Sequence, residues 1–204
     1  MDPAERLQLE SPIKQQIAAG DRNGATTSVL HLYGGELYGF LSGLARDPTI
    51  ADEAYSELCE VVWMQLGEFR WEASLRSWLY AMARRLVLRH RVDGYRREAR
   101  ARPLDLAPEI AELAARLRTT TLEILRSEVK TAFRALRQEL SEEDQELLSL
   151  RVDRDLSWRD IARIVDPDDV DGLDQRAAAL RKRFERVRGR LRELAGERGL
   201  LPEE

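Results

Sequence analysis

Apolar side chains recur at intervals of three and four residues along most of this chain, which is the spacing of one face of an α-helix. The longest such series runs from Leu173 to Leu194. Its members are Leu173, Ala177, Leu180, Phe184, Val187, Leu191 and Leu194. The pattern predicts an all-α protein, because faces of this kind are buried when helices pack against one another.

Three further segments with this spacing lie in the first half of the chain. The first covers about residues 20–47 and ends before Pro48, the second covers 50–69 with an acidic face, and the third covers 73–92 with basic flanks. Turn residues separate them, so they are predicted to be three helices. Together they predict a compact helical domain over residues 1–97.

A change in composition follows the third segment. The stretch EARARPLDLAPE, residues 98–109, contains two prolines and no long periodic run, which is typical of a connection between domains. The stretch PEIAELAARL that overlaps its end predicts one or two amphipathic helical turns. We therefore predict a linker over residues 98–120 and a second small helical domain over residues 121–204.

The second domain has the element order of a helix-turn-helix. A helix is predicted at about 121–139, and three later segments have a short polar residue three positions before an aspartate, a spacing typical of a helix N-cap. These pairs are Ser141 with Asp144, Ser157 with Asp160, and Asp171 with Asp174. A short helix, a turn and a longer basic helix predict that the last helix enters the major groove of DNA.

Positive charge is concentrated in two runs, although the formal net charge of the chain is −4. Residues 84–102 contain eight arginines against two acids, and residues 173–195 contain eight basic side chains against three acids. One basic run is often only a solvated helix face, but one in each predicted domain favours nucleic-acid binding. For the last helix, coiled-coil or protein docking and membrane-surface binding are less favoured alternatives, since like charges repel and neighbouring helices can cover the apolar face.

The sequence offers little support for catalysis, metal binding or membrane insertion. Cys59 is the only cysteine, and His31 and His90 have no ligand spacing around them. Without a glycine-rich phosphate loop or a nucleophile motif, we expect no enzyme, no cofactor and no metal. The N-terminus lacks a signal pattern and no apolar run approaches the ~20 residues of a membrane span, so a cytoplasmic location is expected.

Four stretches together resemble the bacterial RNA polymerase sigma factors of the extracytoplasmic-function type. IADEAYSELCEVVWMQL, residues 50–66, is similar to that family's acidic helix A-E-D-x-x-Q-E-x-F-x-x-x-W, and SLRSWLYAMARRLVLRHR, residues 74–91, is similar to W-L-x-x-I-A-R-N with its following basic run. LSEEDQELLSLRVDRDLSWRDIARIV, residues 140–165, resembles the helix pair that carries L-S-x-x-E-I-A. LRKRFERVRGRLREL, residues 180–194, resembles the recognition helix V-K-S-R-L-x-R-A-R-x-x-L-R-E-L.

The resemblance implies that the chain directs core RNA polymerase to specific promoters by DNA binding and strand opening. It implies docking of Asp52, Glu53 and Glu57 on a coiled coil of the polymerase's largest subunit, and an anti-sigma protein as a further candidate partner. Promoter DNA would be held at the minus-ten element by the first domain and at the minus-thirty-five element by the second. The implied DNA-binding residues are Arg84, Arg85, Arg89, Arg91, Arg96, Arg97, Arg181, Lys182, Arg183 and Arg186.

For a few residues the sequence predicts a more specific role. Phe69 and Trp71 offer stacking surfaces for a flipped base or belong to the core, and Arg183 is predicted to read a base. Three residues depart from the family pattern, which has glutamine, asparagine and aspartate where this chain has Ser56, Arg85 and Arg89. The alternative function is therefore a helix-turn-helix regulator, or a sigma-like protein that does not recruit polymerase.

Overall fold

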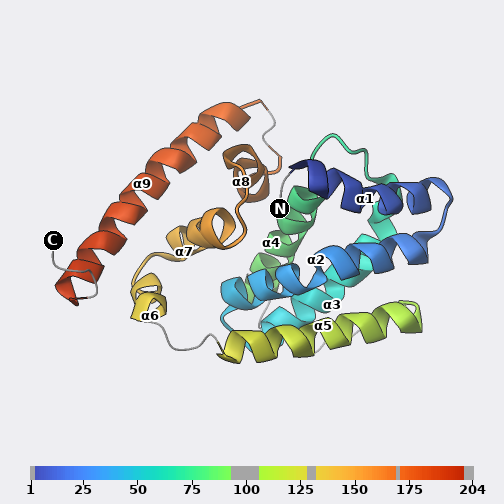
Figure 1. Cartoon of the computed structure of the whole chain (residues 1–204), viewed down its shortest axis with the longest axis horizontal. Coiled ribbons are helices and arrows are strands. Elements are labelled where there is room, and N and C mark those ends of the chain that lie inside the picture. The colour runs from blue at the N-terminus through green and yellow to red at the C-terminus, as the bar shows by residue number, and fades with distance from the viewer. Residues whose placement is uncertain (1–2, 93–105, 128–131, 169–170, 200–204) are drawn as a thin grey trace. The chain divides into compact units, whose positions relative to one another are not determined.

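A computed structural model of the chain describes residues 3–92, 106–127, 132–168 and 171–199, and these residues form helices joined by short connections (Figure 1). The all-α prediction is confirmed, since the described residues contain no strand. The α-helices are α1 (Pro3–Ala18), α2 (Arg22–Ala45), α3 (Pro48–Gln65), α4 (Leu75–Val92), α5 (Pro108–Ser127), α6 (Ala132–Gln138), α7 (Glu142–Leu148), α8 (Trp158–Val165) and α9 (Leu173–Glu197). A 3₁₀ turn, η1 (Leu66–Glu68), follows α3, and a π-helical turn, η3 (Ser149–Asp153), follows α7.

The chain divides into two compact units, Met1–Ile124 and Leu125–Glu204. Helix α5 falls almost wholly in the first unit and runs for 20 residues, where the sequence predicted one or two turns within a linker. The helix predicted over about 121–139 is instead divided between the end of α5 and α6, with residues 128–131 outside the described part. The functional domain limits themselves stay a prediction.

The core of the first unit lies among α2, α3 and α4, which are the three helices predicted from the sequence. Four tyrosines, Tyr33, Tyr38, Tyr55 and Tyr80, are among its largest fully buried side chains. The ring of Tyr38 meets that of Tyr55 edge-on at 5.1 Å, a geometry that the charge distribution of aromatic rings favours. Cys59 is buried, and burial raises the pKa of its thiol to about 12, which makes it unreactive.

Helix α1 packs on α2 and was not predicted. Ile13 is buried, and the hydroxyl of Tyr33 donates a 2.5 Å hydrogen bond to the buried carboxyl group of Glu10. Pro12 lies inside the helix, where proline removes one backbone hydrogen bond. A buried acid and an internal proline hide the amphipathic pattern from a reading of the sequence.

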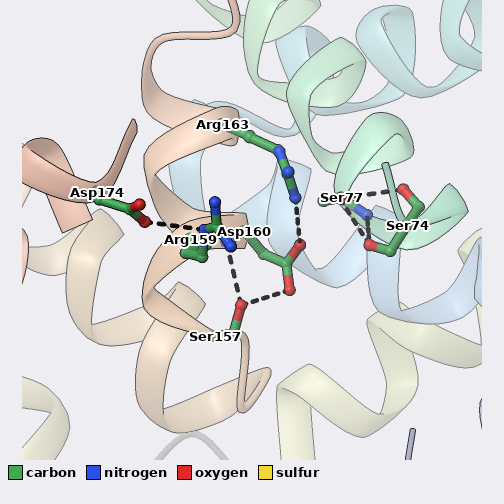
Figure 2. Close-up of polar contacts among 7 residues, drawn as sticks. All are labelled: Ser74, Ser77, Ser157, Arg159, Asp160, Arg163 and Asp174. Carbon is green, nitrogen blue, oxygen red and sulfur yellow. Dashed lines mark hydrogen bonds and ion pairs between the residues drawn. The ribbon is translucent and has the colours of Figure 1, made fainter. Parts of the chain in front are cut away.

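Short polar residues fix where the helices of the first unit begin. Asp47 accepts hydrogen bonds from the backbone N–H groups of Thr49 (2.8 Å) and Ile50 (3.3 Å), and Pro48 occupies the first helical position of α3. At the start of α4, Ser74 Oγ accepts from the N–H of Ser77 at 3.0 Å (Figure 2). These caps satisfy amide groups that have no partner within the helix.

Helix α5 approaches α2 at a pair of glycines. A Cβ atom built on Gly34 would lie 2.6 Å from Leu117 Cδ1 and 2.9 Å from the Tyr55 hydroxyl, whereas one on Gly35 would lie 3.5 Å from Thr121 Oγ1. The missing side chain at Gly34 therefore allows the two helices to lie close together. Helix α5 is held in the first unit by this close approach to α2 and by its buried side chains Ile110 and Leu113.

The two glycines predict opposite effects of alanine. Gly34→Ala is expected to destabilise the chain by about 1–3 kcal/mol, because the new methyl group overpacks a filled site. Gly35→Ala is expected to stabilise it by about 0.5–1 kcal/mol, since alanine is the better residue inside a helix and finds ordinary contact distance here. Thermal and urea unfolding of both variants measure the difference. Equal effects would contradict the close packing at Gly34.

In the second unit, α9 packs on the three helices that precede it. Its first turns bury Leu173 and Ala177 against Ala162 of α8, and its last turns bury Leu194 and Ala195 against Leu136 of α6. Between these two contacts, the ring of Phe184 meets that of Trp158 edge-on at 5.3 Å. The predicted apolar face of the last helix is thus its packing face.

Two of the three predicted N-caps in this unit are confirmed. Ser141 Oγ accepts from the N–H of Asp144 at 3.2 Å, and Ser157 Oγ accepts from the N–H of Asp160 at 3.1 Å and donates to its carboxylate at 2.7 Å (Figure 2). The third cap prediction is wrong, because Gly172 occupies the N-cap position of α9 and no side chain caps this end. Asp174 pairs with Arg159 of α8 at 3.0 Å instead (Figure 2).

Candidate polymerase and DNA interfaces

The acidic residues of α3 that were predicted to bind polymerase lie along one side of the helix but already have partners within the chain. Asp52 accepts a 2.7 Å hydrogen bond from the hydroxyl of Tyr38. Burial raises the pKa of Tyr38 to about 12, and the bond to Asp52 adds to the shift, so this tyrosine stays a donor.

Two residues at the end of α4 contact the other two acids. His90 lies 2.8 Å from Glu57 through Nε2 and 3.5 Å from Glu53 through Nδ1, and Arg89 pairs with Glu57. Glu53 is the more exposed acid, with 37% of its side chain accessible against 32% for Glu57. Burial alone would raise the pKa of Glu57, but the hydrogen bonds from Arg89 and His90 outweigh it and hold that pKa below its usual value.

The lowered pKa of Glu57 predicts a pH-dependent stability. Ionised Glu57 stabilises the folded chain above the carboxyl pKa of the unfolded chain, roughly 4.3, and this contribution is lost as the pH falls through the lower folded value. Wild type should exceed Glu57→Gln by about 1 kcal/mol in unfolding free energy above pH ~5, and this difference should shrink as the pH falls below the carboxyl pKa of the unfolded chain. Urea titrations across this range measure it. A constant gap would exclude an ionised Glu57 as its source.

Aromatic side chains gather at the connection between α3 and α4. Phe69 lies 5.0 Å from the ring of Trp71 and 4.9 Å from that of Trp78, and all three side chains are half-buried. Trp71 has a φ of 59°, which is uncommon for a residue with a large side chain and turns the backbone sharply at this point. Lys14 of α1 places its amino group 4.3 Å above the Trp71 ring. The cluster combines a packing role with partly exposed ring surface.

The basic flank of α4 is engaged in several contacts. Arg85 is exposed and Arg84 is half-buried, and each interacts with other groups of the chain, as does Arg91. Arg89 is paired with Glu57, so its charge is shared with the acidic face of α3. The remaining predicted residues of this domain, Arg96 and Arg97, lie outside the described residues.

The basic residues of α9 fall into two groups. Arg181, Lys182 and Arg186 are exposed, and the guanidinium carbon of Arg181 lies 6.0 Å from the centre of the Trp158 ring. Arg183, the predicted base reader, is half-buried, and its guanidinium contacts Asp144 and Glu143 at the start of α7. We call Arg181, Lys182 and Arg186 the basic face of α9.

One ion pair in the first unit has no counterpart among the contacts predicted from the sequence. Arg76 of α4 donates two hydrogen bonds of 2.7 Å to the two carboxylate oxygens of Glu36 of α2. Burial opposes the charge on Arg76, but the bonds to Glu36 prevail and raise its pKa. The two residues are 40 positions apart, and neither belongs to a helical i, i+4 pair that could have revealed the contact.

The helices that carry the acidic face and the aromatic cluster match a known family. Residues 29–100 match the family described as Sigma-70 region 2. The chain contains a sigma-70 region 2 domain. This domain indicates a sigma factor, which confirms the resemblance predicted for the first domain in its general form. In sigma factors, region 2 binds core RNA polymerase and acts in promoter melting, and these proteins serve transcription initiation without being enzymes.

The match does not reach the second unit, so the helix-turn-helix stays a prediction. A comparison with curated proteins returned no match. Among the described helices, none is both long and apolar enough to cross a membrane. Within that same part of the chain, no three histidine, cysteine, aspartate or glutamate side chains are grouped as metal ligands would be.

Proposed function

We propose that this chain is a sigma factor of the extracytoplasmic-function type that directs core RNA polymerase to specific promoters. The observation that carries the proposal is the sigma-70 region 2 match of residues 29–100. It is supported by the second unit, in which the short α8, a connection and the long α9 follow one another and α9 presents a basic face. Two contacts to DNA, one from each unit, suit a protein that holds two promoter elements.

The first unit would bind both polymerase and the minus-ten element. Asp52, Glu53 and Glu57 form the proposed polymerase surface, and Glu53 is more exposed than Glu57. Phe69 and Trp71 would stack on unpaired bases, since aromatic rings bind single-stranded DNA with little sequence preference. The proposed phosphate contacts are Arg84, Arg85, Arg89, Arg91, Arg96 and Arg97.

The second unit would bind duplex DNA at the minus-thirty-five element. Exposed arginine and lysine side chains on a recognition helix suit both guanine edges and phosphates. Arg181, Lys182 and Arg186 meet this description on α9. Arg183 belongs to the same predicted set and is held by α7. An anti-sigma protein is a further proposed partner.

One observation favours a second candidate function. Arg89 and His90 already occupy Glu57, so part of the proposed polymerase surface is neutralised within the chain. A sigma-like regulator that binds promoter DNA without recruiting polymerase would have no need for this surface to be open. Run-off transcription with core polymerase over a promoter library separates the two. Promoter-specific transcripts support the sigma factor, whereas duplex binding without added transcripts supports the regulator.

Charge reversal at Glu53 tests the polymerase surface at the more exposed of the two acids that contact His90. Glu53→Lys is expected to weaken binding to core polymerase about tenfold, because it places a cation where a basic partner surface is expected. Glu112→Lys on α5 is the matched control, since it makes the same charge change at an exposed position of the same unit. Affinity is measured by titration of labelled core polymerase. Equal affinity of the two variants would remove Glu53 from the interface.

A further inference from the structure

The guanidinium of Arg183 contacts α7 through its three nitrogen atoms. Its Nε donates to Asp144 Oδ1 at 2.6 Å, its Nη1 pairs with Glu143 Oε2 at 2.7 Å, and its Nη2 lies 3.5 Å from Ser141 Oγ. We call Arg183, Asp144 and Glu143 the Arg183 cluster. A bidentate contact to guanine needs two parallel N–H groups on one edge of the guanidinium, and the Arg183 cluster engages both ends of the group.

Electrostatics also oppose DNA contact at this position. Two carboxylates surround one guanidinium, so the Arg183 cluster has an excess of negative charge that repels a phosphate or the acceptor edge of guanine. The side chain of Arg183 is 33% exposed and that of Asp144 only 23%. Burial disfavours the charge on Arg183, but the hydrogen bonds to Asp144 and Glu143 overcome this and raise its pKa.

The contact joins the middle of α9 to α7 within the second unit. The apolar contacts of α9 lie with α8 near its start, with α6 near its end, and with Trp158 of α8 at Phe184, next to Arg183. Arg159 and Asp174 join α8 to α9, but this pair is 60% and 80% exposed and should contribute little (Figure 2). Within the Arg183 cluster the Arg183–Asp144 pair is better shielded than the Arg159–Asp174 pair, whereas Glu143 is 73% exposed. The cluster lies beside Lys182 and one turn from Arg186.

We infer that Arg183 is a positioning residue, which fixes the orientation of α9 on α7 through Asp144 and Glu143 so that Arg181, Lys182 and Arg186 make the sequence-dependent contacts. The inference rests on the proposed DNA-binding function and deepens it. It replaces Arg183 as the base reader, because a guanidinium already bound to two carboxylates would have to leave both before it reached a base. Rigid support of this kind favours binding by reducing the ordering required when the complex forms.

Binding of the full chain, alone and assembled with core polymerase, to DNA duplexes with a randomised minus-thirty-five segment tests the inference. Arg183→Gln and Asp144→Asn should each weaken binding about fivefold to tenfold on all sequences. The double variant should be no weaker than the worse single variant, because both changes remove the Arg183–Asp144 pair. Arg183→Lys should recover part of the loss, since an ammonium still pairs with Asp144. The preferred sequence should be the same for all four variants.

Two controls separate positioning from changes in charge. Asp155→Asn also removes one acid from the unit, at an exposed residue whose φ of 49° asparagine tolerates well. Arg190→Gln removes a cation that pairs with Glu193 of the same helix. Neither should reproduce the effect of Asp144→Asn. A base-reading Arg183 would give the opposite pattern, because Asp144→Asn would free it and strengthen binding, while Arg183→Gln would change the preferred base at one position.

The contact between Arg183 and α7 can be tested even if the proposed DNA-binding function is wrong. If the unaltered chain binds no duplex and directs no transcripts, the DNA proposal falls and the positioning role falls with it. Urea unfolding of wild type, Arg183→Gln, Asp144→Asn and the double variant then still measures the coupling energy between Arg183 and Asp144. Non-additive losses would support the Arg183 cluster as a link between helices, and additive losses would overturn it.

Discussion

Replacing Arg76 with alanine is expected to lower the unfolding free energy of the first unit by about 3 kcal/mol, because the change leaves the carboxylate of Glu36 without its partner in a largely buried position. The side chains of Arg76 and Glu36 are only 10% and 24% exposed, and two hydrogen bonds of 2.7 Å join them. Arg76 also lies over the ring of Tyr80, at 5.6 Å from its centre. Removal of Arg76 thus costs an ion pair and a packing contact together.

Hydrogen exchange of the α2 and α4 amides in urea measures this loss, since it reports on the first unit even if the two units unfold separately. Arg70→Ala is the control, because it removes an exposed arginine from the same unit and should have little effect. The double replacement Arg76→Met and Glu36→Leu should recover most of the stability, since an apolar pair leaves no unpaired charge. A small effect of Arg76→Ala would mean that water reaches Glu36.

The helices that can be predicted from this sequence are those whose signals are local. Helices α2, α3 and α4 follow from apolar spacing, and the starts of α7 and α8 follow from Ser141 and Ser157, because a cap and its amide are three residues apart. Helix α1 was missed because a buried acid, Glu10, replaces an apolar residue on its packing face. Helix α5 was read as a linker because nothing near it in the sequence points to the contact of Leu117 with Gly34.

The candidate sites could be predicted as residue sets but not as contacts. The acids of α3 and the arginines of α4 and α9 stand out by charge alone. Their partners do not, because Glu57 meets His90 across 33 positions and Asp144 meets Arg183 across 39. Arg89, which departs from the family pattern, pairs with Glu57, and no reading of either helix alone reveals this. Charge runs thus identify surfaces, whereas packing decides which charges remain available to a partner.

This distinction leads to the largest expected effect on DNA binding. The triple variant Arg181→Ala, Lys182→Ala and Arg186→Ala removes the exposed basic face of α9 and should weaken duplex binding about a thousandfold, on the estimate that each charged contact contributes roughly 1.5 kcal/mol. If the three contact phosphates, the slope of log affinity against log salt should also fall by about three. Anisotropy titrations with a promoter duplex at several salt concentrations measure both quantities.

The matched control removes the same formal charge farther along the helix. Arg188 pairs with Glu185 and Arg190 pairs with Glu193, each three residues apart within α9, and Arg192 is exposed beside them. Alanine at these three positions should weaken binding less than about tenfold and change the salt slope little. The charges of Arg188 and Arg190 are already partly balanced by the neighbouring acids Glu185 and Glu193. Equal losses in the two triple variants would mean that α9 attracts DNA only through its overall charge. A loss confined to the first variant would place the DNA contact at Arg181, Lys182 and Arg186, where no acid of α7 competes as it does at Arg183.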